Sequence, residues 1–122
     1  MTTLTKQDAQ SAPFISSRDE PIEQVDQGVK RQMLGYGPDL MICRVWFEEN
    51  AVGQIHSHPH SQSSYVESGR FIVTVDDTER ELGPGDSFYV APHLDHGAVC
   101  LEPGVLLDAF SPAREDFLQA EG

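Results

Sequence analysis

Basic residues are scarce in this 122-residue chain, which has 8 Lys and Arg against 20 Asp and Glu and a formal net charge of -12. Binding to nucleic acid or to an anionic membrane surface depends on clustered Lys and Arg, so we expect neither partner. An acidic surface also slows the approach of an anionic substrate. Such a substrate would need a local positive centre, which could be a metal ion, Arg114 or both.

Long apolar runs are also missing. No stretch approaches the roughly 20 apolar residues that span a bilayer, which excludes a membrane-spanning helix. Residues 1–20 are polar, are interrupted by Pro13 and contain no apolar segment of the kind found in a signal peptide. We therefore expect a cytoplasmic protein.

Cysteine is rare, and glycine-rich phosphate loops are missing. The two cysteines, Cys43 and Cys100, lie in apolar stretches rich in β-branched residues. In a chain without a secretion signal they are predicted to be buried thiols rather than a disulfide. Without a glycine-rich phosphate loop, the sequence implies no nucleotide cofactor.

The chain does contain a series of short extended runs separated by Gly, Pro and Asp, a pattern typical of an all-β protein. Its length fits a single domain, which we divide into an N-terminal arm, residues 1–28, and a β-barrel, residues 29–122. The predicted strands include residues 40–48, 71–75, 87–91 and 104–110, and a short helix is expected within 112–118. One face of the first of these strands should carry Met41, Cys43, Val45 and Phe47. About seven or eight such strands predict a barrel or jelly roll.

All five histidines lie in two short segments, 56–60 and 93–96. If residues 56–62 form one extended strand, their alternate side chains share a face, and a second strand could bring His96 across the sheet. The predicted metal ligands are His56, His58, Gln62 and His96. Imidazole nitrogens with one neutral amide oxygen suit a divalent transition metal, and we expect one ion of Ni, Zn, Fe, Mn or Co. A merely polar cluster is the alternative.

Four further residues are candidates for supporting roles. His60 is expected on the ligand face, where it would orient a ligand or the substrate. His93 is expected in a solvated loop. Tyr65 and Tyr89 are candidate hydroxyl groups of a cavity.

Two motifs resemble those of the cupin superfamily. The first pairs two histidines one residue apart with a third ligand and a later glycine, here His56, His58, Gln62 and Gly69. The second combines a turn, a short strand, a proline and a histidine, here Pro84-Gly85-Asp86, Pro92 and His96. This resemblance implies a single-domain cupin jelly roll, also described as a double-stranded β-helix barrel. Gln62 stands where many cupins carry glutamate, and His93 and Asp95 replace small or proline residues.

A narrower resemblance covers almost everything after Val29. Residues 29–35, 56–62 and 108–118 are similar to the small cupins of pectin and alginate degradation. The resemblance implies a metal-dependent isomerase that converts 4,5-unsaturated uronate monomers into linear 5-keto-4-deoxyuronates by ring opening and tautomerisation. The metal would act as a Lewis acid and hold the carboxylate and ring oxygen.

Three residues near the end of the chain are candidates for that chemistry. Asp108 is predicted to point inward from the last strand as general base and acid, with a surface carboxylate as the alternative. Arg114 would hold the uronate carboxylate through a bidentate fork, unless it pairs with Glu115 or Asp116. Phe110 would form a cavity wall against the sugar ring, or else pack in the core.

Two other functions share the same residues, namely a mononuclear iron cupin dioxygenase and a non-catalytic sugar-binding cupin. Gln62 weighs against oxidation, because a neutral ligand stabilises higher iron charge poorly. We also expect a homodimer, since a β-barrel of this size often covers an exposed edge strand with a second subunit.

Overall fold

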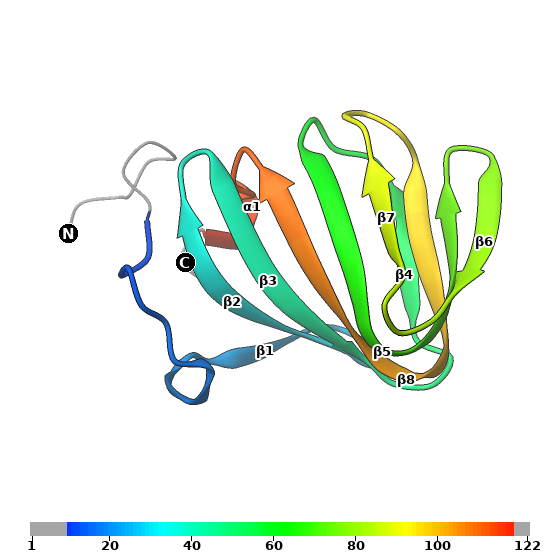
Figure 1. The fold of residues 1–122 in the computed structure, drawn as a ribbon, viewed down its shortest axis with the longest axis horizontal. Helices are drawn as coiled ribbons and strands as arrows, with labels where there is room; N and C mark the ends of the chain where they lie inside the picture. The colour runs from blue at the N-terminus through cyan, green and yellow to red at the C-terminus, as the bar shows by residue number, and fades with distance from the viewer. Residues whose placement is uncertain (1–9, 119–122) are drawn as a thin grey trace.

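Antiparallel strands make up most of the protein, which a computed structural model describes over residues 10–118. In chain order the elements of this range are η1 (Ser17–Asp19), β1 (Ile22–Asp26), β2 (Val29–Gly37), β3 (Leu40–Phe47), β4 (Val52–His56), β5 (Ser61–Val75), β6 (Thr78–Leu82), β7 (Ser87–Val90), β8 (His96–Ser111) and α1 (Glu115–Leu118). The strands form one curved sheet, and α1 lies beside β2 and β3 (Figure 1). The predicted all-β class is confirmed.

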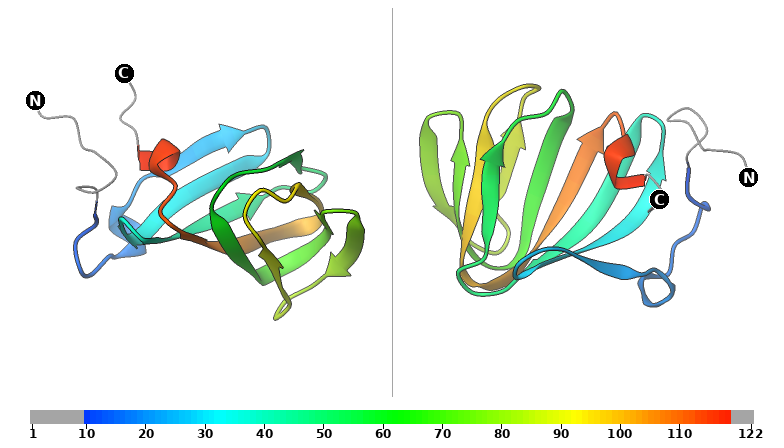
Figure 2. Two further views of the ribbon diagram at one scale, coloured as in Figure 1. Left: turned by 90° about the horizontal axis from the view of Figure 1, so that it is seen from above. Right: turned by 180° about the vertical axis from the view of Figure 1, so that it is seen from behind.

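Two long strands turn this sheet into a barrel. The strand order is β1-β2-β3-β8-β5-β6, with β4 paired to β8 and β7 paired to β5. β5 and β8 pair along their lengths, from Ser61 opposite Ser111 to Val75 opposite His96. The first half of β8 also pairs with β4, and its second half pairs with β3. Each long strand therefore runs through both walls of the barrel, and the sheet curls around an interior (Figure 2).

Gly69 marks the bend in β5. The pairing of β5 with β8 shifts register on both sides of this residue. Its φ of +82° is one that glycine adopts without steric cost, and a Cβ atom here would lie 2.5 Å from the Cα of Gly104. The two backbones cross at a separation that admits only glycine, which accounts for the glycine of the first sequence motif.

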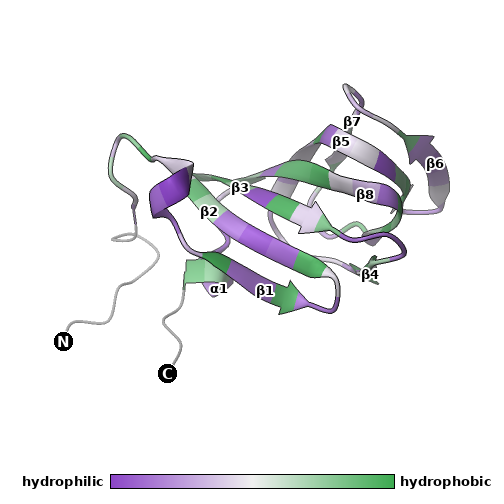
Figure 3. Ribbon diagram, turned by 90° about the horizontal axis from the view of Figure 1, so that it is seen from below, coloured by the Kyte–Doolittle hydropathy of each residue, from purple (hydrophilic) through white to green (hydrophobic). Residues whose placement is uncertain are grey.

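Alternating burial along β3 supplies one wall of the core. The buried face is the predicted one, Met41, Cys43, Val45 and Phe47. Phe47 packs edge-on against Phe71 of β5, with ring centroids 5.2 Å apart. Burial of one such side chain contributes about 1.5–3 kcal/mol. Figure 3 shows hydrophobic and hydrophilic residues mixed along β1, β2 and β8, as expected for strands with one face toward an interior.

Pro59 interrupts the segment expected to be a single strand. β4 ends at His56 and β5 begins at Ser61, so residues 56–62 do not form one strand. Proline has no N–H to donate to a neighbouring strand, and a short loop replaces the ladder here. The prediction that alternate residues of this segment share one strand face is therefore wrong.

Other expected elements are present but longer or differently placed. The predicted strands 71–75 and 104–110 are parts of β5 and β8, and the predicted C-terminal helix is α1. Phe117 and Leu118 of α1 pack against the core. β1 lies within residues 1–28 and pairs with β2. The division into arm and barrel stays a prediction, and residues 1–9 of the arm lie outside the described range.

The predicted state of the two cysteines is confirmed. Cys43 and Cys100 are both free and buried. Among residues 10–118, no helix is both long enough and apolar enough to cross a membrane.

Candidate metal centre and cavity

Three histidines converge at one end of the barrel. His56, the last residue of β4, is the Cα partner of His96, the first residue of β8. His58 reaches the same point from the loop that follows β4. One ring nitrogen from each histidine lies within 4.8 Å of the others. The tertiary fold thus assembles three of the four predicted ligands.

Backbone carbonyl groups orient all three imidazole rings. The Nδ1 atoms of His56, His58 and His96 lie 2.8, 3.0 and 3.0 Å from the carbonyl oxygens of Gln54, His60 and Leu94. Because a carbonyl oxygen can only accept a hydrogen bond, each Nδ1 carries the proton and donates it. Each Nε2 is then left with a free lone pair, which is the state that binds a metal.

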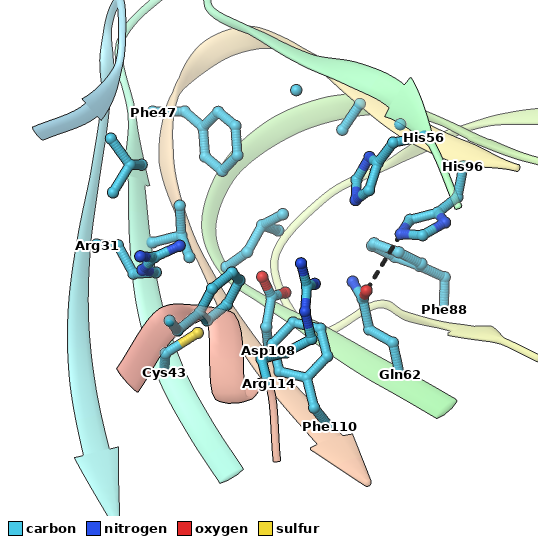
Figure 4. A pocket seen from close by; sticks show the side chains of 17 residues that line it. Arg31, Cys43, Phe47, His56, Gln62, Phe88, His96, Asp108, Phe110 and Arg114 are labelled. Carbon is cyan, nitrogen blue, oxygen red and sulfur yellow. Dashed lines mark hydrogen bonds between the residues drawn. The ribbon is translucent and has the colours of Figure 1, made fainter. Parts of the chain in front are cut away.

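Gln62 provides the fourth predicted ligand. Its Oε1 atom lies 2.9 Å from Nε2 of His58. The same oxygen lies 3.2 Å from Nε2 of His96 (Figure 4). Burial lowers the pKa of both histidines, which favours their neutral form. Two nitrogen lone pairs and an amide oxygen therefore face one another without a proton between them. A cation at this point would satisfy all three acceptors, so the donor set fits a divalent transition metal.

A hydrogen-bond chain leads from Gln62 to Asp108. The Nε2 atom of Gln62 donates to Oγ of Ser64 over 2.9 Å, and this hydroxyl donates to Oδ1 of Asp108 over 2.6 Å. Ser64 has one proton, and an ionised carboxylate can only accept. The chain therefore fixes the orientation of the Gln62 amide, with its oxygen toward the histidines.

Asp108 faces the barrel interior, as predicted, and not the outer surface. Burial raises the pKa of its carboxyl group to about 6, although the hydrogen bond from Ser64 and the charges of Arg114, His56 and Arg31 act in the opposite direction. A carboxyl group with such a pKa is ionised at neutral pH yet accepts a proton readily. This is the property required of a general base that later returns its proton.

A cavity of about 160 Å³ connects His56 and His96 with Asp108. Most of its wall is apolar, and its polar and charged lining residues are Arg31, His56, Gln62, His96, Asp108 and Arg114. Phe110, two residues after Asp108 on β8, also lines the cavity and is itself buried. The two roles considered for Phe110, cavity wall and core packing, are therefore combined in one side chain.

Arg114 lines the cavity but already has a carboxylate partner. Its Nε and Nη2 atoms donate to the two carboxylate oxygens of Asp116 over 3.0 and 2.9 Å. The guanidinium group also lies over the rings of Phe117 and Phe110, 4.2 and 5.2 Å from their centroids. The ion pair considered as an alternative for Arg114 is thus present, and it occupies the Nε and Nη2 edge of the guanidinium group.

Two residues of the site, the cavity residue Arg31 and the buried Ser64 of the hydrogen-bond chain to Asp108, were not singled out from the sequence. Ser64 follows the ligand Gln62 by two residues on β5, so it shares the inward face. Arg31 lies between Val29 and Met33 on the inward face of β2. Strand alternation around the predicted ligand Gln62 and around Val29 and Met33 was the signal that could have identified both.

The remaining candidate residues from the sequence do not line the cavity. Tyr65 and Tyr89 are exposed on the outer face of the sheet, so their predicted place in the cavity is wrong. His93 is exposed in the loop before β8, as expected. The backbone oxygen of His60 accepts a hydrogen bond from the predicted ligand His58. The orienting role expected of the His60 side chain stays a prediction.

A curved antiparallel barrel with three histidines and one glutamine converging in its interior defines a metal-binding protein of the cupin class. The family model described as "Cupin domain" matches residues 44–110, which is more than half of the chain. The chain belongs to the cupin family.

Three similar proteins show which cupins this chain resembles in sequence and structure. The chain is 41% identical over 100 residues to the pectin degradation protein KdgF of Dickeya dadantii (strain 3937), covering 80% of this chain and 91% of that protein. The structure of KdgF from Halomonas sp. has 38% identity and a TM-score of 0.84, covering 88% of this chain and 99% of that one. An RmlC-like cupin from Shewanella frigidimarina NCIMB 400 has 52% identity and a TM-score of 0.87, covering 88% of this chain and 97% of that one.

Proposed function

We propose that this protein converts 4,5-unsaturated uronate monomers into linear 5-keto-4-deoxyuronates. The observation that carries the proposal is the chain from Gln62 through Ser64 to Asp108, which joins a metal-ligand set to an acid–base carboxyl group in one cavity. The similarity to a pectin degradation protein supports the choice of substrate class, because pectin is a polymer of uronates.

The proposed substrate needs only proton transfers. It is a cyclic enol ether with a carboxylate on C5 and a hemiacetal hydroxyl on C1. Loss of the hydroxyl proton forms the C1 aldehyde and breaks the bond between C1 and the ring oxygen, which leaves an enolate. Protonation of C4 then gives the C5 ketone, so the reaction consumes no oxidant, reductant or water.

His56, His58, Gln62 and His96 would hold the metal ion. When bound, a divalent metal acts as a Lewis acid that stabilises the negative charge developing on oxygen. The backbone carbonyl groups behind the three rings keep the ligand nitrogens aimed inward. His58 and His96 are buried, whereas His56 is exposed.

Asp108 would carry out both proton transfers of the reaction. Its ionised carboxylate takes the proton of the hemiacetal hydroxyl and, now protonated, delivers one to C4. A positioned acid or base of this kind accelerates a reaction by about 10²- to 10⁴-fold. The buried apolar ring of Phe110 stands beside this carboxyl group and keeps bulk water away. Arg114, held by Asp116, adds positive charge to the same wall.

We also propose that the protein acts as a cytoplasmic homodimer. The exposed apolar side chains include Leu40, Tyr65 and Tyr89, and a second subunit could cover such side chains. Light scattering of the purified protein should give twice the monomer mass of 13.5 kDa, and a monomeric mass would contradict the dimer without affecting the enzymatic proposal.

Ultraviolet absorbance of an unsaturated galacturonate monomer, freshly released by a lyase, tests the proposed reaction. Metal-loaded protein should remove the absorbance of the C4–C5 double bond much faster than buffer, and chelated protein or Asp108→Ala should not. Asp77→Ala is the matched control, because Asp77 is exposed in the turn after β5.

Three outcomes would contradict the proposed reaction. A rate no faster than buffer with fully metal-loaded protein would overturn it. Oxygen uptake that requires Fe(II) would identify a dioxygenase instead. Tight binding of the uronate without turnover would identify a sugar-binding cupin.

A further inference from the structure

Arg31 brings a second guanidinium group to the cavity. It lies on β2, across the barrel interior from the histidines, and lines the same cavity as Asp108 and Arg114. Figure 4 shows Asp108 between Arg31 on one side and His56 and His96 on the other. The cavity therefore has a cationic group at one end and a metal-ligand set at the other.

No carboxylate side chain engages Arg31. Within residues 10–118 it forms no ion pair shorter than 4.0 Å and donates no side-chain hydrogen bond. Its guanidinium group instead lies over the ring of Phe117, 3.6 Å from the centroid. Arg114, by contrast, already donates two hydrogen bonds to Asp116. Among the described residues, Arg31 thus keeps all five guanidinium N–H donors for a ligand, whereas two of the five on Arg114 are already committed to Asp116.

The position of Arg31 favours binding of an anion. Half-burial removes water from the guanidinium group and lowers its pKa, and this effect outweighs the opposing influence of Cys43, Glu23 and Asp116. An anion bound there would restore the lost solvation. Guanidinium and carboxylate groups match in shape and form charge-assisted, bidentate pairs.

We propose that Arg31 binds the carboxylate of the substrate and so selects uronates over neutral sugars. This inference rests on the proposed function and assigns the carboxylate to Arg31 rather than to the metal or Arg114. The carboxylate is attached to C5, and the ring oxygen links C5 to C1. With the carboxylate at Arg31, the ring oxygen and the hemiacetal hydroxyl of C1 lie toward Asp108 and the metal ligands.

Steady-state kinetics with the unsaturated uronate and its methyl ester test this assignment. The ester has the same ring but no negative charge. We expect Arg31→Met to lower kcat/KM for the acid by about 10- to 100-fold, mainly by raising KM, because the variant loses one charge-assisted pair with the substrate. Turnover of the ester should be unchanged, so the preference for the acid collapses. Arg31→Lys should recover part of that preference.

Lys30→Met is the matched control. It removes the same charge from the adjacent position of β2, where the side chain is exposed on the opposite face. It should keep the wild-type preference for the acid, which separates a local carboxylate contact from a change in net charge.

Two results would overturn the assignment to Arg31. One is an unchanged acid preference in Arg31→Met. The other is an equal loss for acid and ester, which would assign Arg31 a packing role against Phe117 alone.

Calorimetric titration of metal-loaded protein with the acid and with the ester separates this inference from the proposed reaction. Binding of the acid that depends on Arg31, without turnover, would retain the carboxylate site and reject the reaction. Equal binding of both compounds by the wild type would reject the carboxylate site.

Discussion

The hydroxyl of Ser64 donates a hydrogen bond to the carboxylate of Asp108 over 2.6 Å, although 44 residues separate the two in the chain. They are Cα partners in the pairing of β5 with β8. The register of these two strands therefore decides which hydroxyl meets which carboxyl group. The same Ser64 accepts from Gln62, so it connects the proposed metal site with the proposed base.

Ser64→Ala should weaken both metal binding and catalysis. The Gln62 amide would lose the group that fixes its orientation, and the buried Asp108 carboxylate would lose a donor, a type of loss that costs about 1–3 kcal/mol. We expect about 10-fold weaker metal affinity, measured by competition with a fluorescent chelator, and a lower kcat. Ser63→Ala is the control, because Ser63 is exposed on the opposite face of β5. Unchanged metal affinity in Ser64→Ala would show that Gln62 is oriented by other contacts.

The activity should depend on the ionisation of Asp108. Because the base must be deprotonated, kcat/KM should rise with pH and level off above the pKa of Asp108, which is about 6 without metal and lower when a cation is bound nearby. Asp108→Asn should lose about 10²- to 10⁴-fold in kcat. Metal content must be measured at each pH, because protonated histidines release metal. A flat profile through this pH range at full metal occupancy would exclude Asp108 as the base.

Asp108 should also make stability depend on pH. Its pKa is raised from 3.8 to about 6 on folding, so the folded state binds the proton more tightly than the unfolded state. Stability is then lost as pH rises from about 4 to 6, and the cost stays in full above that range. In metal-free protein, Asp108→Asn should be more stable than the wild type at pH 8 by at most about 3 kcal/mol. Urea unfolding should show this difference vanish near pH 4, and a difference independent of pH would contradict it.

Metal removal should destabilise the protein. Ligand present at 100 times its dissociation constant stabilises the folded state by about 2.7 kcal/mol, so chelation should lower Tm measurably. His96→Gln should abolish this response, because His96 is a buried member of the ligand set. His93→Asn should respond like the wild type, because His93 is exposed in the preceding loop. A Tm that chelator leaves unchanged in the wild type would count against a metal bound by these ligands.

Much of the fold was predictable from local patterns. Alternating apolar residues identified the buried face of β3, and the Pro84-Gly85-Asp86 turn marked the approach to β7. The full lengths of β5 and β8 were not predictable, because each bends and changes its pairing partners midway. Tyr65 and Tyr89 were misplaced for a related reason, since which strand face points inward depends on the register and bulges of the barrel.

The sequence by itself determined the all-β class and the kinds of ligand available, because alternation, turns and side-chain chemistry are local properties. It pointed to Asp108 as an acid–base candidate through the resemblance of residues 108–118 to the small cupins of pectin and alginate degradation. The tertiary structure alone decided which groups meet. It joined Ser64 to Asp108, and it left Arg31 without a carboxylate partner in the described part of the chain. The physical reason is that hydrogen bonds and ion pairs act over a few ångströms, and only the long-range pairing of bent strands brings such distant residues that close.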